Sequence, residues 1–166
     1  MRRFFLPLFI ALAASGAAFI IATAGDLPTH VASHFGRTDQ PNAWTPRDTY
    51  VAIMVGAATL LPLFFLVILI TWLPRIFPGA VNLPNRDYWL APERRERSLA
   101  ALADFGWAFG CLFTLFIVGV HWVVVAANTS VPAQLPDRPF QGLIASFIAA
   151  MCIWTVALRL RFRRPG

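Results

Sequence analysis

Four long apolar stretches constrain the fold of this chain more than any other feature. They cover residues 4–24, 50–73, 105–127 and 140–158, and none contains an aspartate, glutamate or arginine. A helix needs roughly 20 apolar residues to cross about 30 Å of hydrocarbon, and the alternating pattern of a barrel strand is absent. With 58% hydrophobic and 13% charged residues, a soluble fold is excluded. The sequence predicts an all-α membrane protein: one domain, residues 1–166, folded as a bundle of four transmembrane helices.

The arginines predict how these helices are oriented. Eleven of the 14 basic residues lie before the first span, between the second and third, or after the fourth. Arginine is in excess on cytoplasmic segments, so we expect both termini and the loop 74–104 in the cytoplasm and the loop 25–49 outside. The chain has no lysine, which is typical of a GC-rich bacterial genome, so the bacterial inner membrane is the expected location. Topology and attraction to lipid headgroups account for the net charge of +6, and no nucleic-acid partner is expected.

The N-terminus allows a second interpretation. Two arginines, an apolar run and the small residues 22–24 resemble a secretory signal and its cleavage site. The apolar run exceeds the usual signal core of about 7 to 15 residues, which favours a retained helix. Cleavage would leave three spans in the same orientation.

The predicted cytoplasmic loop combines a compact motif with a short helix. The stretch VNLPNRDYWLAPERR mixes aromatic, proline and charged residues, which suits a loop at headgroup level. Its candidate residues are Asn82, Pro84, Asn85, Tyr88, Trp89, Glu93 and Arg94. Pro92 and Glu93 are typical of a first helical turn, so we expect a short interfacial helix that leads into the third span. Gly106 and Gly110 form a G-x-x-x-G pattern that predicts a close helix contact.

The loop 25–49 is too long for a simple connection, since helix connections in bundles usually have about 2 to 8 residues. It is rich in turn-forming proline, glycine and asparagine. Such a loop either folds on the bundle or binds another molecule. We expect an ordered loop that packs His34, Phe35 and Trp44 against the outer helix ends, with Asn42 and Arg47 as further loop-packing or ligand-binding residues.

The histidines are the candidate metal ligands. His30 and His34 are four residues apart, a spacing that places both imidazoles on one face of a helix, and His121 lies within reach of the outer end of the third span. The alternative is that His34 or His121 is a structural hydrogen-bond anchor. The sequence has no nucleophile motif, and Cys111 and Cys152 lie inside spans, where cysteine packs as a small apolar residue. A metal ion bound by these histidines is therefore the only cofactor that the sequence suggests.

The loop resembles a known bacterial domain. LPTHVASHFGRTDQPNAW is similar to membrane proteins with the domain of unknown function 1648, in which a Leu-Pro pair precedes a His-Phe pair, a Pro-Asn turn and a tryptophan. The matching residues are Leu27, Pro28, His34, Phe35, Pro41, Asn42, Trp44 and Arg47. Asp39-Gln40 departs from the pattern, because relatives tend to have a glycine before the proline. A distant relative is the immunity protein against a sporulation-delaying toxin, whose cytoplasmic signature differs from the one here.

Three functions follow as expectations. The first is a non-enzymatic inner-membrane protein that binds a protein partner, peptide or lipid through its outer loop, with an immunity or sensing role. The second is an accessory subunit of a larger membrane complex, for which small-residue helix faces are suited. The third is a metal-binding membrane enzyme or carrier that uses His30, His34 and His121. Membrane lipids, a protein partner or a second copy of the chain are the expected partners.

Overall fold

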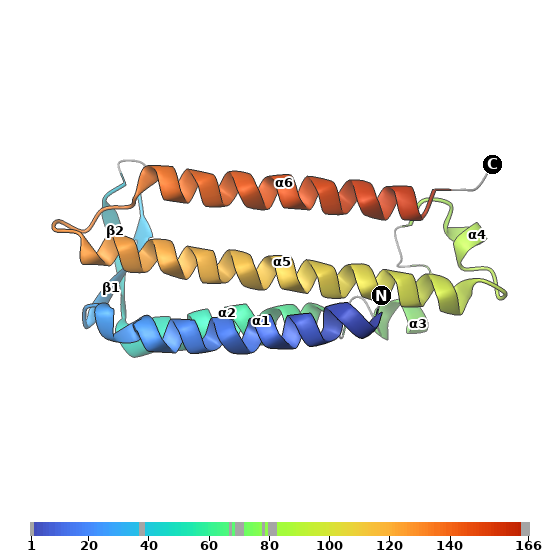
Figure 1. Ribbon diagram of the computed structural model, residues 1–166, viewed down its shortest axis with the longest axis horizontal. Helices are drawn as coiled ribbons and strands as arrows, with labels where there is room; N and C mark the ends of the chain where they lie inside the picture. The colour runs from blue at the N-terminus through green and yellow to red at the C-terminus, as the bar shows by residue number, and fades with distance from the viewer. Residues whose placement is uncertain are drawn as a thin grey trace.

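The computed structural model describes residues 2–36, 39–66, 68, 72–77, 79 and 83–163. Four helices in this part of the chain are long and apolar enough to cross a membrane, which confirms the prediction of four long apolar helices. They are α1 (Arg2–Ala22), α2 (Arg47–Phe65), α5 (Arg95–Thr129) and α6 (Asp137–Arg161). They run side by side along the long axis of the molecule (Figure 1).

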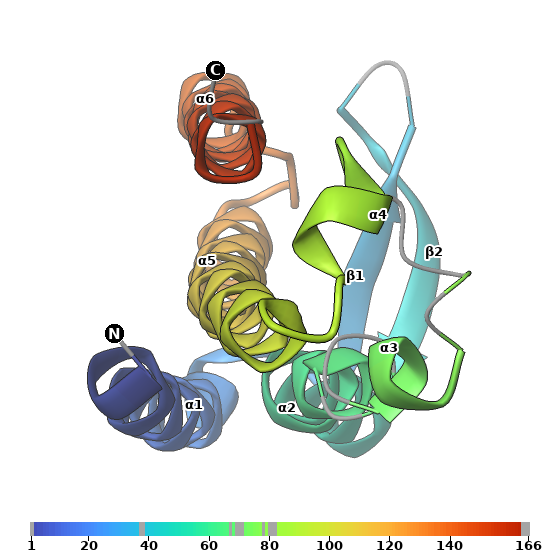
Figure 2. The same cartoon turned by 90° about the vertical axis from the view of Figure 1, so that its right-hand side faces the viewer.

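The helices do not form a symmetrical square. Helices α1, α2 and α5 pack against one another, whereas α6 packs on the side of α5 away from α1 and α2 (Figure 2). No residue of α6, a helix that the structure describes throughout, is buried. The arrangement is thus a three-helix core with a fourth helix attached through α5.

Small residues permit the close approaches within this arrangement. A Cβ atom added at Gly16 of α1 would lie 2.7 Å from the Val118 side chain on α5. One added at Gly110 would lie 2.6 Å from Leu66 and 3.2 Å from Phe9. The helix contact predicted from the G-x-x-x-G pattern is confirmed at Gly110.

The third predicted span is longer than expected. α5 has 35 residues, about 52 Å at 1.5 Å per residue, and it includes the segment predicted as a separate interfacial helix. The prediction of a helix that leads into the third span is therefore confirmed, but the helix is not a short interfacial element. It is continuous with α5, because no proline or glycine interrupts the chain between Arg95 and Phe105 and because Ser98, Leu99 and Ala103 are buried. The length of α5 exceeds the thickness of the hydrocarbon core of a membrane, about 30 Å, so part of the helix would lie outside that core.

The described residues of the loop 25–49 contain secondary structure that the all-α prediction lacks. A 3-10 turn, η1 (Thr23–Asp26), follows α1, and an antiparallel hairpin, β1 (His30–Phe35) and β2 (Pro41–Pro46), leads into α2. The hairpin lies at the end of the bundle where α5 ends and α6 begins, which we call the hairpin end (Figure 1). The opposite end, with α3 (Leu73–Ile76) and α4 (Arg86–Trp89), is the arginine end.

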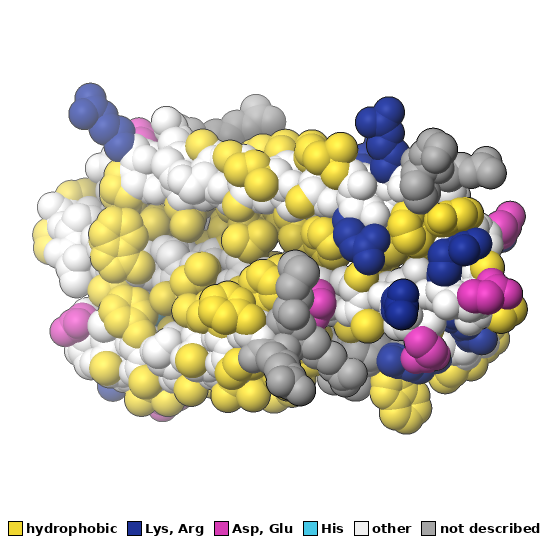
Figure 3. Space-filling model, turned by 45° about the vertical axis from the view of Figure 1, so that its right-hand side comes forward, with side chains coloured by type: hydrophobic (Ala, Val, Ile, Leu, Met, Phe, Trp, Pro, Cys, Tyr) yellow, Lys and Arg dark blue, Asp and Glu magenta, His cyan; other side chains and the backbone are white. Residues whose placement is uncertain are grey.

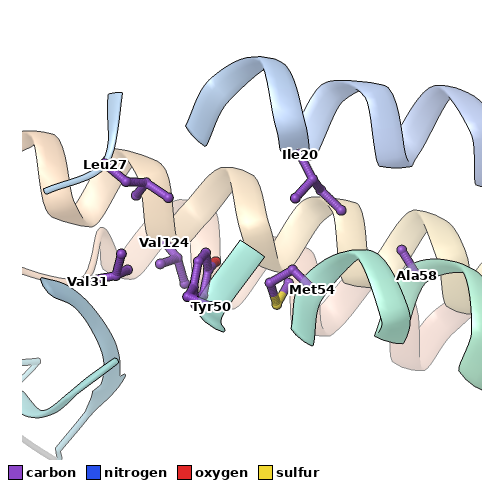
Figure 4. Packing of buried hydrophobic residues seen from close by; sticks show 7 residues of the cluster. All are labelled: Ile20, Leu27, Val31, Tyr50, Met54, Ala58 and Val124. Carbon is purple, nitrogen blue, oxygen red and sulfur yellow. The ribbon is translucent and has the colours of Figure 1, made fainter. Parts of the chain in front are cut away.

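One hydrophobic cluster joins the hairpin to the helices (Figure 4). It consists of Ile20, Leu27, Val31, Tyr50, Met54, Ala58 and Val124. These residues come from α1, the following loop, β1, α2 and α5, so the hairpin shares the core of the helices. Figure 3 shows hydrophobic side chains over the middle of the visible face and a gathering of charged side chains toward the arginine end.

Candidate functional site

The hairpin is held at its base by Arg47, the first residue of α2. The Arg47 amide donates to the carbonyl of Thr29 at 3.0 Å, and its guanidinium donates to the carbonyl of Leu27 at 3.2 Å. Leu27 and Val31 are buried in the core cluster. The candidate residue Arg47 thus closes the loop on itself, and buried apolar side chains fix the loop to the bundle.

Asn128, near the end of α5, fastens the outer edge of β1. Its side-chain oxygen accepts from the amide of Ala32 at 2.8 Å, and its side-chain nitrogen donates to the carbonyl of Ala32 at 3.1 Å. The same nitrogen also donates to the carbonyl of Val124 at 2.9 Å. The carboxamide therefore replaces a neighbouring strand, pairing both backbone groups of a residue that is only 1% exposed. Sequence reasoning missed Asn128, although a polar side chain at the end of an apolar helix was a signal for such a role.

The face of the hairpin directed away from the helices carries the other candidate residues. Asn42 and Trp44 are two positions apart on β2, so their side chains lie on one face of the strand. The His34 ring hydrogen-bonds to the Asn42 side chain, and both are exposed. Trp44 is 56% exposed, so the prediction that Trp44 and His34 pack against the helix ends is wrong. Val31 and Leu27 fill that space instead, and Phe35 is half-buried.

The turn of the hairpin touches the connection between α5 and α6. Asp39 adopts a left-handed backbone conformation with φ of 57°, and its carbonyl accepts from the amide of Leu135 at 3.1 Å. The Asp39 carboxyl shares a hydrogen bond with Asp137 at the start of α6, which raises the pKa of Asp39 above its usual value, with desolvation and carboxylate repulsion adding to the effect. The turn of the hairpin thus contacts the end of the α5–α6 connection that leads into α6.

His121 is the centre of a buried polar network between three helices. Thr23 donates its hydroxyl hydrogen to the carbonyl of Phe19 at 2.8 Å, so it accepts from Nε2 of His121 at 2.8 Å. Nδ1 of His121 then accepts from the hydroxyl of Tyr50 at 3.2 Å, and the two rings stack with centroids 5.7 Å apart. Both ring nitrogens are therefore satisfied, and this geometry fits the alternative of a structural hydrogen-bond anchor for His121.

The three histidines are not brought together. His30 and His34 lie on β1 with exposed side chains, whereas His121 is fully buried among α1, α2 and α5. Within the described part of the chain, no three histidine, cysteine or acidic side chains are placed to share a metal ion. Because the segment is a strand rather than a helix, the four-residue spacing of His30 and His34 does not bring their imidazoles together as it would on one face of a helix.

The motif at the arginine end forms a local fold of its own. Asn85, with φ of 54°, precedes α4, and its backbone carbonyl accepts from the amides of Tyr88 and Trp89. The Arg94 guanidinium lies 4.1 Å from the centre of the Tyr88 ring and donates to the Tyr88 carbonyl at 3.1 Å. Pro84 and Glu93 are exposed. The motif residue Asn82 lies outside the described residues.

Trp89 attaches this motif to the end of α6. Its indole nitrogen donates to the carbonyl of Phe162 at 2.7 Å, and the two rings meet edge to face. The Arg161 guanidinium lies 5.4 Å from the centre of the Trp89 ring. The two ends of α6 are thus joined to other parts of the chain, one through the hairpin turn and the other through the motif.

Comparison of the chain with protein-family models, with curated proteins and with solved structures finds no match. The functional interpretation therefore depends on geometry alone. Within the hairpin, β1 is covered on its outer edge by Asn128, whereas the sheet has no third strand among the described residues to cover β2.

Proposed function

We propose that this chain is a multi-pass membrane protein that binds an extended peptide segment of a partner along β2. The observation that carries the proposal is the asymmetry of the hairpin, in which one edge is fastened and the other is open beside an exposed tryptophan. An open strand edge pairs readily with an extended chain through main-chain hydrogen bonds. Exposed aromatic side chains of this kind are enriched at protein interfaces.

The hairpin is also suited to this role by its rigidity. A binding element that is already ordered loses less conformational entropy when its partner arrives. The contacts of Leu27, Val31 and Asn128 with the helices supply that order. No catalytic residues are needed for such a function, and the proposal is for a binding protein rather than an enzyme.

The arginine distribution supports an orientation with the hairpin outside the cell. The arginine end carries Arg75, Arg86, Arg94, Arg95, Arg97, Arg159, Arg161 and Arg163 among the described residues. By the excess of arginine on cytoplasmic segments, we place this end in the cytoplasm of a bacterium and the chain in its inner membrane. An immunity or sensing role would agree with an outward hairpin.

Site-specific photo-crosslinking in intact cells tests the proposal. A photoreactive residue replaces Ala43, which is exposed on β2, and a matched control replaces Val131, which is 99% exposed at the same end of the molecule. We expect a discrete adduct from position 43 that disappears when Trp44→Ala is added, and none from position 131. Identical adducts from both positions, or an adduct that survives Trp44→Ala, would contradict peptide binding along β2.

A second candidate function is that of an accessory subunit in a larger membrane complex. The observation that favours it is that α6 packs mainly on α5 and leaves Ile148, Ile153 and Val156 exposed. A partner helix seated on this face would copurify at fixed stoichiometry, and Ile153→Arg would release it. Copurification that is unaffected by Ile153→Arg would argue against a contact through α6.

A further inference from the structure

The attachment of α6 mainly to α5 leaves a groove between α1, α5 and α6. It has a volume of about 480 Å³, within the usual range of about 300 to 1,000 Å³ for ligand sites. Its walls are apolar side chains, including Leu8 and Leu12 of α1, Leu112 of α5 and Ile153 of α6. Among the described residues, the only acidic or basic side chain that lines it is that of Asp104 on α5.

The groove has a polar end and an apolar end. Asp104 lies closest to the arginine end among the lining residues of α5, and the last one along the helix is Leu115. These two residues are about 16 Å apart along the helix axis, at 1.5 Å per residue. A single charged group followed by this length of apolar surface matches an amphiphile with one polar head and a hydrocarbon tail.

The Asp104 side chain lacks a hydrogen-bond partner within the described structure. Its Oδ1 atom is buried and accepts no hydrogen bond from a described residue. The indole nitrogen of Trp154, which also lines the groove, donates to the carbonyl of Phe105 at 2.9 Å instead. Arg95 lies nine residues before Asp104, half a turn round the helix, so it faces away from the groove. An unpaired buried carboxylate oxygen is costly, so a donor from outside the chain would be stabilising.

We propose that this groove binds one membrane lipid with a primary-amine headgroup, phosphatidylethanolamine, whose ammonium group donates to Asp104 and whose acyl chain lies along the apolar walls. The positive ammonium complements the carboxylate and supplies N–H donors. The quaternary nitrogen of phosphatidylcholine has the charge but no N–H group, and phosphatidylglycerol has no cation. The inference uses the membrane location proposed above and is independent of the role of the hairpin.

Native mass spectrometry of the detergent-purified full chain tests the assignment. The protein is incubated with equal amounts of phosphatidylethanolamine, phosphatidylcholine and phosphatidylglycerol that carry the same acyl chains. We expect one bound phosphatidylethanolamine, preferred about tenfold over phosphatidylcholine, as a charge-assisted hydrogen bond implies. Asp104→Asn removes the charge and reduces the preference to about onefold, whereas the matched control Asp87→Asn, whose side chain is 96% exposed, keeps it.

A second variant tests the groove itself. Ala108 lines the groove on α5, so Ala108→Phe fills it and is expected to displace the bound lipid of every class. This measurement does not depend on whether Asp104→Asn folds well. The proposal is overturned if the parent protein shows no preference among the three lipids, if Asp104→Asn keeps the preference, or if Ala108→Phe retains the lipid. A second copy of the chain in the groove, seen as a lipid-free dimer, would also overturn it.

Discussion

Replacing Asn128 with alanine should release the hairpin from the helices. The variant removes two hydrogen bonds to Ala32 and leaves a buried amide and a buried carbonyl without partners. An unpaired buried polar group costs about 1 to 3 kcal/mol, so the free energy that docks β1 should fall by roughly 2 to 4 kcal/mol. A loss of 2 kcal/mol corresponds to about 30-fold faster hydrogen exchange of the β1 amides, because 1.4 kcal/mol is a factor of ten.

Hydrogen exchange read by mass spectrometry on the detergent-solubilised protein is the assay. Asn128→Asp should also speed the exchange, because it keeps an acceptor for the Ala32 amide but has no N–H group for the carbonyls of Ala32 and Val124. Thr129→Ala is the control, since that hydroxyl bonds only within its own helix, to Ala126. Unchanged exchange across β1 in Asn128→Ala would refute the docking argument.

Three further substitutions test other contacts. His121→Ala should lower the free energy of unfolding by about 2 to 4 kcal/mol, since it removes two buried hydrogen bonds and leaves a cavity, and a reduced melting temperature in detergent would show this. Trp44→Ala should change the free energy of unfolding by less than about 0.5 kcal/mol, because the side chain is exposed; a clearly lower melting temperature would mean that it packs on the bundle. The raised pKa of Asp39 means that the folded state binds its proton more tightly, so contact with Asp137 strengthens as pH falls through that pKa and weakens above it. Exchange of the Leu135 amide, corrected for its intrinsic rate, should therefore slow toward pH 4, and Asp39→Asn should abolish this dependence.

The helices were predictable because their signal is long and uniform. An uncharged apolar run of about 20 residues has few alternatives to a helix in an apolar layer. The spacing of Gly106 and Gly110 likewise predicted a close helix contact, which the structure has at Gly110. The start of α5 was harder, because Pro92 and the arginines suggested a separate element. Burial of Leu99 and Ala103, which depends on tertiary packing, keeps the helix continuous.

The hairpin was predicted as an ordered loop but not as strands. Its apolar residues do not alternate strictly, and the register is irregular around His34, so no period-2 pattern marks it. Trp44 was predicted to pack against the outer helix ends, yet Val31 and Leu27 are the buried residues there. Asn128 matters because it bonds to Ala32, which is far away in the sequence, and Asp104 matters because its buried Oδ1 atom has no partner among the described residues. Sequence spacing alone reveals neither.

The proposed function requires the two ends of the molecule to face opposite sides of a membrane, with the hairpin outside. Labelling of single cysteines in intact cells with a membrane-impermeant thiol reagent tests this directly. In a Cys111→Ala, Cys152→Ala background, Ala43→Cys at the hairpin end should react before permeabilisation, and Arg163→Cys at the arginine end should react only afterwards. Reaction of Arg163→Cys in intact cells while Ala43→Cys stays protected would contradict the proposed orientation and, with it, an external partner for the hairpin.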